Sequence, residues 1–185
     1  MEITIDGNTY IDGPDSGIDN FYSMLEESTE IPTTSAPQPE EYLDRFREAA
    51  ELSDSIFCIS VSAKLSAAYD AALTAARLFE NEQSATQVRV FDSGTAASSQ
   101  ALITLAAARA ATAGASIDEV EAVARKVAAN VRLVAILDTL KYIHRSGRVP
   151  KIAMWATSAL NIKPVMEYSA GNVGPIARQI SVSKA

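Results

Sequence analysis

Two short runs of strand-forming residues, each followed by a helix-length segment, constrain this chain more than any other feature. The run Ile56–Ile59 is continuously apolar, which is typical of a parallel strand covered on both faces. Val88–Phe91 forms a second run, and the segments Ala67–Glu80 and Ala96–Ala113 that follow the two runs have helical patterns. Strands that alternate with helices predict an α/β fold, with a parallel sheet covered by helices.

The first 39 residues predict a hairpin, a helix and a loop. Asp6-Gly7 lies between two short β-prone runs and supplies the positive φ angles of a tight hairpin over Met1–Ile11. Ile31–Pro39 is rich in Pro, Thr and Ser and predicts a loop. Between them we expect a helix over Ile18–Glu27, whose apolar face consists of Phe21, Tyr22 and Leu25.

Helix-start signals and a change of pattern organise the rest of the chain. Pro39, followed by two glutamates, predicts a helix to about Leu52. Ser116 and Glu119 form a capping-box pattern for a helix that ends near Asn130. We expect an N-terminal α/β domain over 1–130 and part of a second α/β domain over 131–185. The second part predicts a strand at Val131–Leu137, short helices at Asp138–Arg145 and Met154–Leu160, a strand at Ile162–Tyr168 and a turn at Gly171–Gly174.

Composition excludes several classes of function. The chain has 185 residues and a formal net charge of −7, which disfavours binding to nucleic acids or anionic lipids. With one cysteine and one histidine, the chain cannot form an intramolecular disulfide, a CxxC metal cluster or a His-rich metal site. We expect no metal site and no cofactor. The N-terminus lacks a signal-peptide pattern, so the expected location is the cytoplasm. Polar residues interrupt Ala96–Ala113, which therefore predicts a buried helix and no membrane span.

Three hydroxyl-rich loops are the main candidates for a binding site. They are Thr33–Pro37, Ser60–Ser66 and Ser93–Thr95, and each precedes a helix. Helix N-termini offer free N–H groups and partial positive charge, to which hydroxyls add uncharged donors. Together the loops predict an anion-binding platform. The alternative is that each loop only caps its helix.

The lone histidine and lone cysteine are weaker candidates. His144 lies in a run of basic residues. This run can be read as a phosphate-facing rim or as a docking surface for an acidic partner. The alternative is a solvated helix face. The members of this run are Lys141, His144, Arg145, Arg148 and Lys151. Cys58 lies inside a strand pattern and is expected to be a buried, inert thiol. No Rossmann or P-loop glycine motif is present, so nucleotide binding through those motifs is excluded.

Six segments, taken in order, resemble the DegV family over nearly the whole chain. They are ITIDGNTYIDG at Ile3–Gly13, PTTSAPQP at Pro32–Pro39, ISVSAKLSAAY at Ile59–Tyr69, VFDSG at Val90–Gly94, ILDTLKYIHRSGRV at Ile136–Val149 and NIKPV at Asn161–Val165. DegV-like proteins are two-domain α/β proteins that bind a long-chain fatty acid, with the carboxylate at the domain interface and the acyl chain in an apolar tunnel. Some are the non-catalytic, lipid-presenting subunit of a fatty acid kinase.

The resemblance assigns roles to particular residues. It implies that Thr34 and Ser66 hydrogen-bond the carboxylate. It places Ser35, Ser62 and Ser93 as supporting or nearby residues, and Arg148 near the mouth of the site. The implied partners are a long-chain fatty acid and a fatty acid kinase catalytic subunit, and the oligomeric state stays open.

The chain also departs from the family pattern. The family's first strand, which ends in Thr-Asp-Ser, its first helix and its C-terminal continuation have no counterpart, so we expect a truncated or divergent short form. Ala36, Ala67 and Ser146 replace a Gln and two Gly residues of the family, and His144 does not match the family's later histidine. One alternative function is an α/β enzyme of kinase or hydrolase type that acts on a small polar substrate, with Ser66 as nucleophile and His144 or a carboxylate as base. Another is a non-binding, oligomer-forming remnant.

Overall fold

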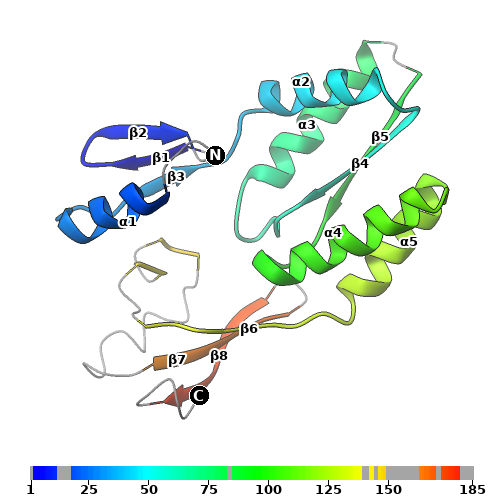
Figure 1. Cartoon of the computed structure of the whole chain (residues 1–185). Coiled ribbons are helices and arrows are strands. Elements are labelled where there is room, and N and C mark those ends of the chain that lie inside the picture. The colour runs from blue at the N-terminus through cyan, green and yellow to red at the C-terminus, as the bar shows by residue number, and fades with distance from the viewer. Residues whose placement is uncertain are drawn as a thin grey trace.

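The computed structural model describes residues 2–11, 18–82, 85–138, 142–143, 146–148, 163–169 and 172–179. These residues form three small sheets with strand orders β2-β1-β3, β4-β5 and β6-β7-β8 (Figure 1). The β4–β5 pair lies between two pairs of helices, with the other two sheets outside it. The predicted α/β fold with a helix-covered parallel sheet is therefore confirmed.

The central sheet follows from the two strand-forming runs. Strands β4 (Ser55–Ser60) and β5 (Gln87–Asp92) pair in parallel, with Ile56 opposite Val88. Helix α3 (Ala68–Asn81) connects them and packs beside α2 (Pro39–Ala50), while α4 (Ala97–Thr112) and α5 (Ile117–Ala128) cover the other face.

Alternating side chains of the two strands build two hydrophobic clusters, because successive residues of a strand point to opposite faces. On one face, Ile56 and Cys58 pack against a cluster of α2, α3 and β5 residues: Leu43, Phe46, Ala75, Ala76, Phe79 and Val88. On the other face, Phe57 and Ile59 pack against a cluster of β5, α4 and α5 residues: Phe91, Ile103, Ala107, Val120 and Ala124.

Strand β4 is covered on both faces, as predicted. The side chains of Ile56–Ile59 are nevertheless only half-buried, because β4 is paired along one edge in the described two-stranded sheet. One prediction about burial was wrong. Helix α4 buries one stripe, to which Ile103 and Ala107 belong, and leaves Leu102 55% and Leu105 46% exposed. None of the helices in the described ranges is long and apolar enough to cross a membrane.

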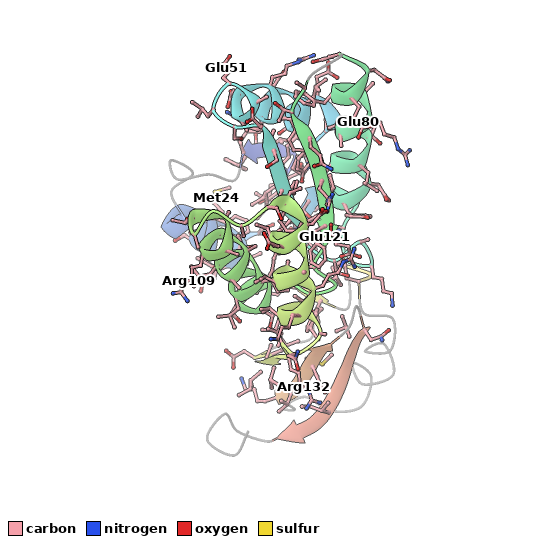
Figure 2. The ribbon with its side chains drawn as sticks, turned by 90° about the vertical axis from the view of Figure 1, so that its right-hand side faces the viewer. Met24, Glu51, Glu80, Arg109, Glu121 and Arg132 are labelled. Atoms are coloured by element: carbon pink, nitrogen blue, oxygen red, sulfur yellow. The ribbon has the colours of Figure 1, made fainter. Side chains whose placement is uncertain are left out.

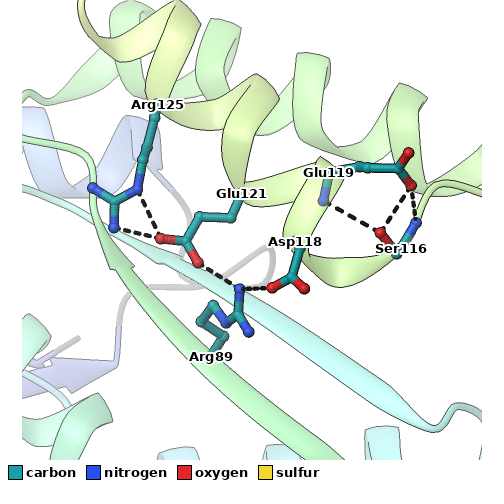
Figure 3. Close-up of polar contacts among 6 residues, drawn as sticks. All are labelled: Arg89, Ser116, Asp118, Glu119, Glu121 and Arg125. Atoms are coloured by element: carbon teal, nitrogen blue, oxygen red, sulfur yellow. Dashed lines mark hydrogen bonds and ion pairs between the residues drawn. The ribbon is translucent and has the colours of Figure 1, made fainter.

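An ionic cluster attaches α5 to β5 (Figure 3). Arg89 donates from Nη1 to Asp118 at 2.7 Å and to Glu121 at 2.8 Å. Arg125 donates from Nε to the second oxygen of Glu121 at 2.8 Å, and its guanidinium carbon lies 5.4 Å from the ring centroid of Phe91. The pKa of Glu121 is lowered overall: burial raises it, and the hydrogen bonds from the two arginines outweigh that effect.

The helix-start signals are confirmed. Helix α2 begins at Pro39, and Glu41 Oε1 accepts from the backbone N–H of Gln38 at 3.0 Å. At the start of α5 the backbone N–H of Glu119 donates to Ser116 Oγ at 3.4 Å, and Glu119 Oε2 accepts from the backbone N–H of Ser116 at 2.8 Å. This second hydrogen bond, with that from the Ser116 hydroxyl, lowers the pKa of Glu119.

The N-terminal sheet confirms the hairpin and corrects the loop. Strands β1 (Glu2–Ile5) and β2 (Asn8–Ile11) pair antiparallel around Asp6 and Gly7, whose φ angles are 48° and 75°. Part of the predicted loop is strand β3 (Thr33–Ser35), which pairs with the free edge of β1. Helix α1 (Ile18–Glu27) has the predicted bounds, but Tyr22 on its expected apolar face is 58% exposed.

The third sheet is antiparallel. It contains β6 (Leu133–Ile136), β7 (Lys163–Ser169) and β8 (Asn172–Gln179), with Met166 buried. The turn predicted up to Gly174 was wrong, because residues 172–174 pair with β7. The helix predicted at 154–160 lies outside the described residues, and of the one predicted at 138–145 only residues 142–143 are described as helical. The division into domains at residue 130 stays a prediction.

Candidate functional site

A polar cavity of about 480 Å³ is the candidate site, and three separate segments line it. Residues 34–36 belong to β3 and the link after it, residues 63–67 connect β4 to α3, and residues 146–148 form a turn from the second half of the chain. The cavity thus brings together four residues named from the sequence: Thr34, Ser35, Ser66 and Arg148. Its lining holds two cationic residues, and no acidic residue is among the lining residues that the structure describes.

A tight turn after β4 positions the middle wall of the cavity. Ser62 is 1% exposed, and its carbonyl accepts from the backbone N–H groups of Leu65 at 2.9 Å and Ser66 at 3.2 Å. Its hydroxyl accepts from the backbone N–H of Lys64 at 3.3 Å. Ser62 therefore lies beneath the turn and holds Lys64, Leu65 and Ser66 along the cavity wall.

Asp92, at the end of β5, fastens this turn to the next loop. Its Oδ1 accepts from the backbone N–H of Ala63 at 3.2 Å and of Gly94 at 2.8 Å. The backbone N–H of Ser62 donates to the carbonyl of Thr95 at 2.8 Å, which adds a second connection. Sequence reasoning did not single out Asp92, although its position directly before Ser93-Gly94 at a strand end was a usable signal.

The third hydroxyl-rich loop lies behind the cavity wall. Ser93 is 4% exposed, is absent from the described lining, and donates from Oγ to the carbonyl of Thr95 at 3.2 Å. The hydroxyl of Thr95 is buried and has no hydrogen-bond partner within the described residues. Two of the three predicted loops therefore reach the cavity, and the third supports the second.

Within the described residues, two hydroxyls at the cavity keep a proton to donate. Ser66 Oγ accepts from the backbone N–H of Ala68 at 3.2 Å, which uses one of its two lone pairs, and its O–H donates to no group in those residues. Thr34 is exposed on β3, and its hydroxyl contacts no polar group in the described part of the chain. Ser35 differs, because its hydroxyl donates to Glu2 Oε2 at 2.9 Å and so ties β3 to β1.

Two cations stand at the same cavity. Arg148 donates from Nη1 to the carbonyl of Ser146 at 2.8 Å, across a turn in which Gly147 has a φ of 72°. Lys64 donates from Nζ to Asn172 Oδ1 at 3.2 Å. Among the residues that the structure describes, neither cation has an ion-pair partner. The other four members of the basic run lie outside those residues.

The described surroundings of Ser66 do not form a catalytic dyad. A serine nucleophile needs a base within hydrogen-bond reach. No carboxylate or imidazole of the described ranges bonds to Ser66 Oγ, and His144 falls outside them. The same ranges contain no group of three or more His, Cys, Asp or Glu side chains that could hold a metal ion. Cys58 packs in the α2–α3 face of the sheet, and burial raises the pKa of its thiol.

A second, apolar cavity of about 290 Å³ lies between β4 and the α4–α5 pair. It shares no lining residue with the polar cavity. The residues that line it are Ser55, Phe57, Ile59, Thr104, Ala107, Ala108, Ala111, Ala115, Ile117 and Val120.

Comparison with known proteins identifies the class. A family model described as "Uncharacterised protein, DegV family" matches residues 1–185. The chain belongs to the DegV family. It is 36% identical over 176 residues to the DegV domain-containing protein SCO2569 of Streptomyces coelicolor, a match that covers 87% of this chain and 61% of the relative.

Solved structures of DegV family proteins and of a fatty acid-binding protein are similar to this chain. A stearic acid-binding protein from Eubacterium ventriosum is 28% identical, with a TM-score of 0.87, and the match covers 99% of this chain and 63% of that protein. A DegV family protein from Thermus thermophilus, solved in a study of its fatty acid binding, is 27% identical with a TM-score of 0.87, covering 99% and 64%. The chain thus spans about three fifths of the length of the relatives that it matches.

Proposed function

We propose that this chain binds a long-chain fatty acid and holds the carboxylate in the polar cavity. The observation that carries the proposal is the meeting of Thr34 and Ser66, each with a hydroxyl proton to donate, in a cavity without an acidic residue in its described lining. A carboxylate accepts hydrogen bonds and donates none, so it matches such a pair. The fatty-acid-binding relatives support the same ligand class.

The tail and the head group have different roles in this proposal. Burial of an acyl chain contributes roughly 0.8 kcal/mol per methylene, so the tail supplies most of the affinity. Hydrogen bonds to a charged group contribute about 1.5–3 kcal/mol each. Because they are directional, they fix the position of the head group. Ser62 and Ser93 keep the wall in place from behind, and Ser35 secures β3.

We also propose that the protein presents the bound carboxylate to a fatty acid kinase and performs no chemistry itself. Uncharged donors hold a carboxylate without a tight ion pair, which leaves an oxygen available to a phosphoryl donor. Thr34 is exposed, so the head group is reachable from solvent. Arg148 lies at the same cavity, where it would face the incoming partner.

Mass spectrometry of an organic extract of the purified chain tests the proposal. We expect a long-chain fatty acid in stoichiometric amount. After delipidation, a Thr34→Ala, Ser66→Ala double variant should rebind fatty acid at least about 10-fold more weakly. Thr112→Ala is the matched control, since its exposed hydroxyl donates to the carbonyl of Ala108 on α4, outside the cavity. A clean extract together with no rebinding by the wild type would contradict the proposal.

A further inference from the structure

One edge of β4 is open in the part of the chain that the structure describes. There, β5 is the only strand that pairs with β4. The carbonyls of Asp54 and Ser60 accept from backbone N–H groups at the two ends of β5, at 3.0 Å and 3.1 Å, so both point towards β5. Because the hydrogen-bonding direction alternates along a strand, the opposite edge presents the N–H and C=O groups of Ser55, Phe57 and Ile59.

These outward backbone groups are not paired with another strand of the described ranges. The carbonyl of Ser55 accepts from Ser53 Oγ at 3.2 Å. The carbonyl of Ile59 accepts from Gln100 Nε2 at 3.4 Å, which is longer than the usual range. Between them, the N–H and C=O of Phe57 have no hydrogen-bond partner among the described residues. An unpaired strand edge is a template for the backbone of an added strand.

The apolar cavity of about 290 Å³ lies beside this open edge. Ser55, Phe57 and Ile59 line it, and its described lining includes no residue of β5. The other lining residues have small or aliphatic side chains, and none in the described lining is charged. Opposed residues of paired strands point to the same face of a sheet, so an added strand would direct every second side chain into the cavity.

The shape of the site favours a single strand over two other occupants. The cavity volume is at the lower limit of roughly 300–1,000 Å³, the range of cavities that enclose a small-molecule ligand. Helix α4 lies over the open edge, since Gln100 reaches the outward carbonyl of Ile59. A second copy that paired through its own β4 would bring its own α4 to the same place, so the two helices would compete for it.

We infer that the open edge of β4 and the apolar cavity form a docking site for one extended segment of another polypeptide. The segment is uncharged and has apolar side chains at alternate positions. Its backbone extends the β4–β5 sheet, and its apolar side chains enter the cavity below α4. The site shares no lining residue with the polar cavity, so it adds a protein partner to the proposed lipid ligand.

A fluorescent, capped peptide of alternating valine and threonine, with one terminal lysine for solubility, is the probe. Fluorescence anisotropy measures its binding to the purified chain. Ala108→Phe fills the cavity from an exposed position of α4 and should weaken binding at least about 10-fold. Ala101→Phe is the matched control, since it adds the same ring at an exposed position of α4 outside the cavity lining. It should bind the peptide as the wild type does.

Two measurements on the wild type test the backbone pairing itself. A fully N-methylated peptide keeps the side chains but has no N–H group to donate, so it should bind at least about 10-fold more weakly. With the unmodified peptide, the backbone amide of Phe57 should exchange its hydrogen at least about 10-fold more slowly. The amide of Cys58, which points towards β5, should change less than about twofold.

Four outcomes would overturn the inference and leave fatty acid binding standing. They are no binding of the peptide, equal binding by Ala108→Phe and the wild type, equal binding of the N-methylated peptide, and unchanged exchange at Phe57. Concentration-dependent association of the chain that the peptide does not reverse would also overturn it, because a second copy would then occupy the edge.

Discussion

The α/β unit, made of β4, β5 and helices α2–α5, is held together by different forces from those that shape the polar cavity. The unit buries aromatic and aliphatic side chains such as Phe46, Phe79 and Ile103 on both faces of its sheet. The cavity wall is instead held by backbone N–H groups that donate to the side chains of Ser62 and Asp92. Stability and ligand binding should therefore respond to different substitutions, and each prediction below tests that separation.

The largest effect is expected in the core. Phe79→Ala removes a buried ring that packs edge-on against Phe46, and should lower the free energy of unfolding by about 3–5 kcal/mol. Denaturant unfolding measures this change. Leu78→Ala, at a position on the same helix that is 42% exposed, should cost about 1 kcal/mol or less. Fatty acid affinity is then measured under conditions where Phe79→Ala is folded. If this variant binds fatty acid more weakly than the wild type does, stability and binding are not separable.

Asp92 should be the exception, since it lies at the end of a core strand and holds the cavity wall. Asp92→Ala leaves the N–H groups of Ala63 and Gly94 without their acceptor, so we expect a loss of about 1–3 kcal/mol of stability. Because the turn that carries Ser66 is then released, fatty acid affinity should fall about 10-fold in the same variant. Asp92→Asn keeps an acceptor oxygen and should be intermediate in both. A loss of stability with unchanged affinity would contradict this account of Asp92.

A smaller effect is expected from the ionic cluster that joins α5 to β5. Glu121 has a lowered pKa, so its stabilising contribution is complete above the ordinary value of 4.5 and is lost as the pH falls through the folded-state pKa. Glu121→Gln should cost about 1 kcal/mol at pH 7, and the difference from wild type should shrink below about pH 4.5. Denaturant unfolding from pH 7 to pH 3 follows this difference.

Glu80→Gln is the control for that series, because Glu80 is exposed on α3 (Figure 2). It should change the free energy of unfolding by less than about 0.5 kcal/mol across the series. Neither glutamate variant should change fatty acid affinity. If Glu121→Gln lowers the free energy of unfolding equally at pH 7 and pH 3, the packing of the Glu121 side chain, and not its charge, holds α5 to β5.

The smallest effect concerns the reactivity of the single cysteine. Burial raises the pKa of Cys58, so little thiolate forms at neutral pH. The comparison is a Cys58→Ala, Ala101→Cys variant, whose only cysteine lies at an exposed position of α4. A disulfide reagent should modify Cys58 of the wild type at least about 10-fold more slowly than it modifies the cysteine of this variant. Equal rates would indicate that the packing around Cys58 does not protect its thiol from the reagent.

The sequence predicted the elements that depend on local signals or on strong periodicity. The hairpin at Asp6-Gly7, the bounds of α1 and the capping box at Ser116 agree with the structure. Strand β3 was missed because Thr33–Ser35 carries no apolar pattern and is extended only through pairing with β1. The exposure of Leu102 was missed because an alanine-rich helix has too little contrast between its faces to show which one is buried.

The site divides in a similar way. Thr34, Ser66 and Arg148 were named by family resemblance, and the structure brings all three to one cavity, although their roles stay proposals. Lys64 was part of a quoted motif but received no role, and Asp92 received none, because their importance depends on contacts with Asn172 and Ala63 that no local pattern shows.

The carboxyl resonance of a bound fatty acid, isotope-labelled at its carboxyl carbon and followed by NMR through a pH titration, tests the central claim most directly. If Thr34 and Ser66 donate to the carboxylate beside two cations, the bound carboxyl should stay ionised to a lower pH than that of an unbound fatty acid. The Thr34→Ala, Ser66→Ala variant should move its pKa upward again. A bound carboxyl that titrates alike in wild type and double variant would contradict the account, since its head group would then lie elsewhere.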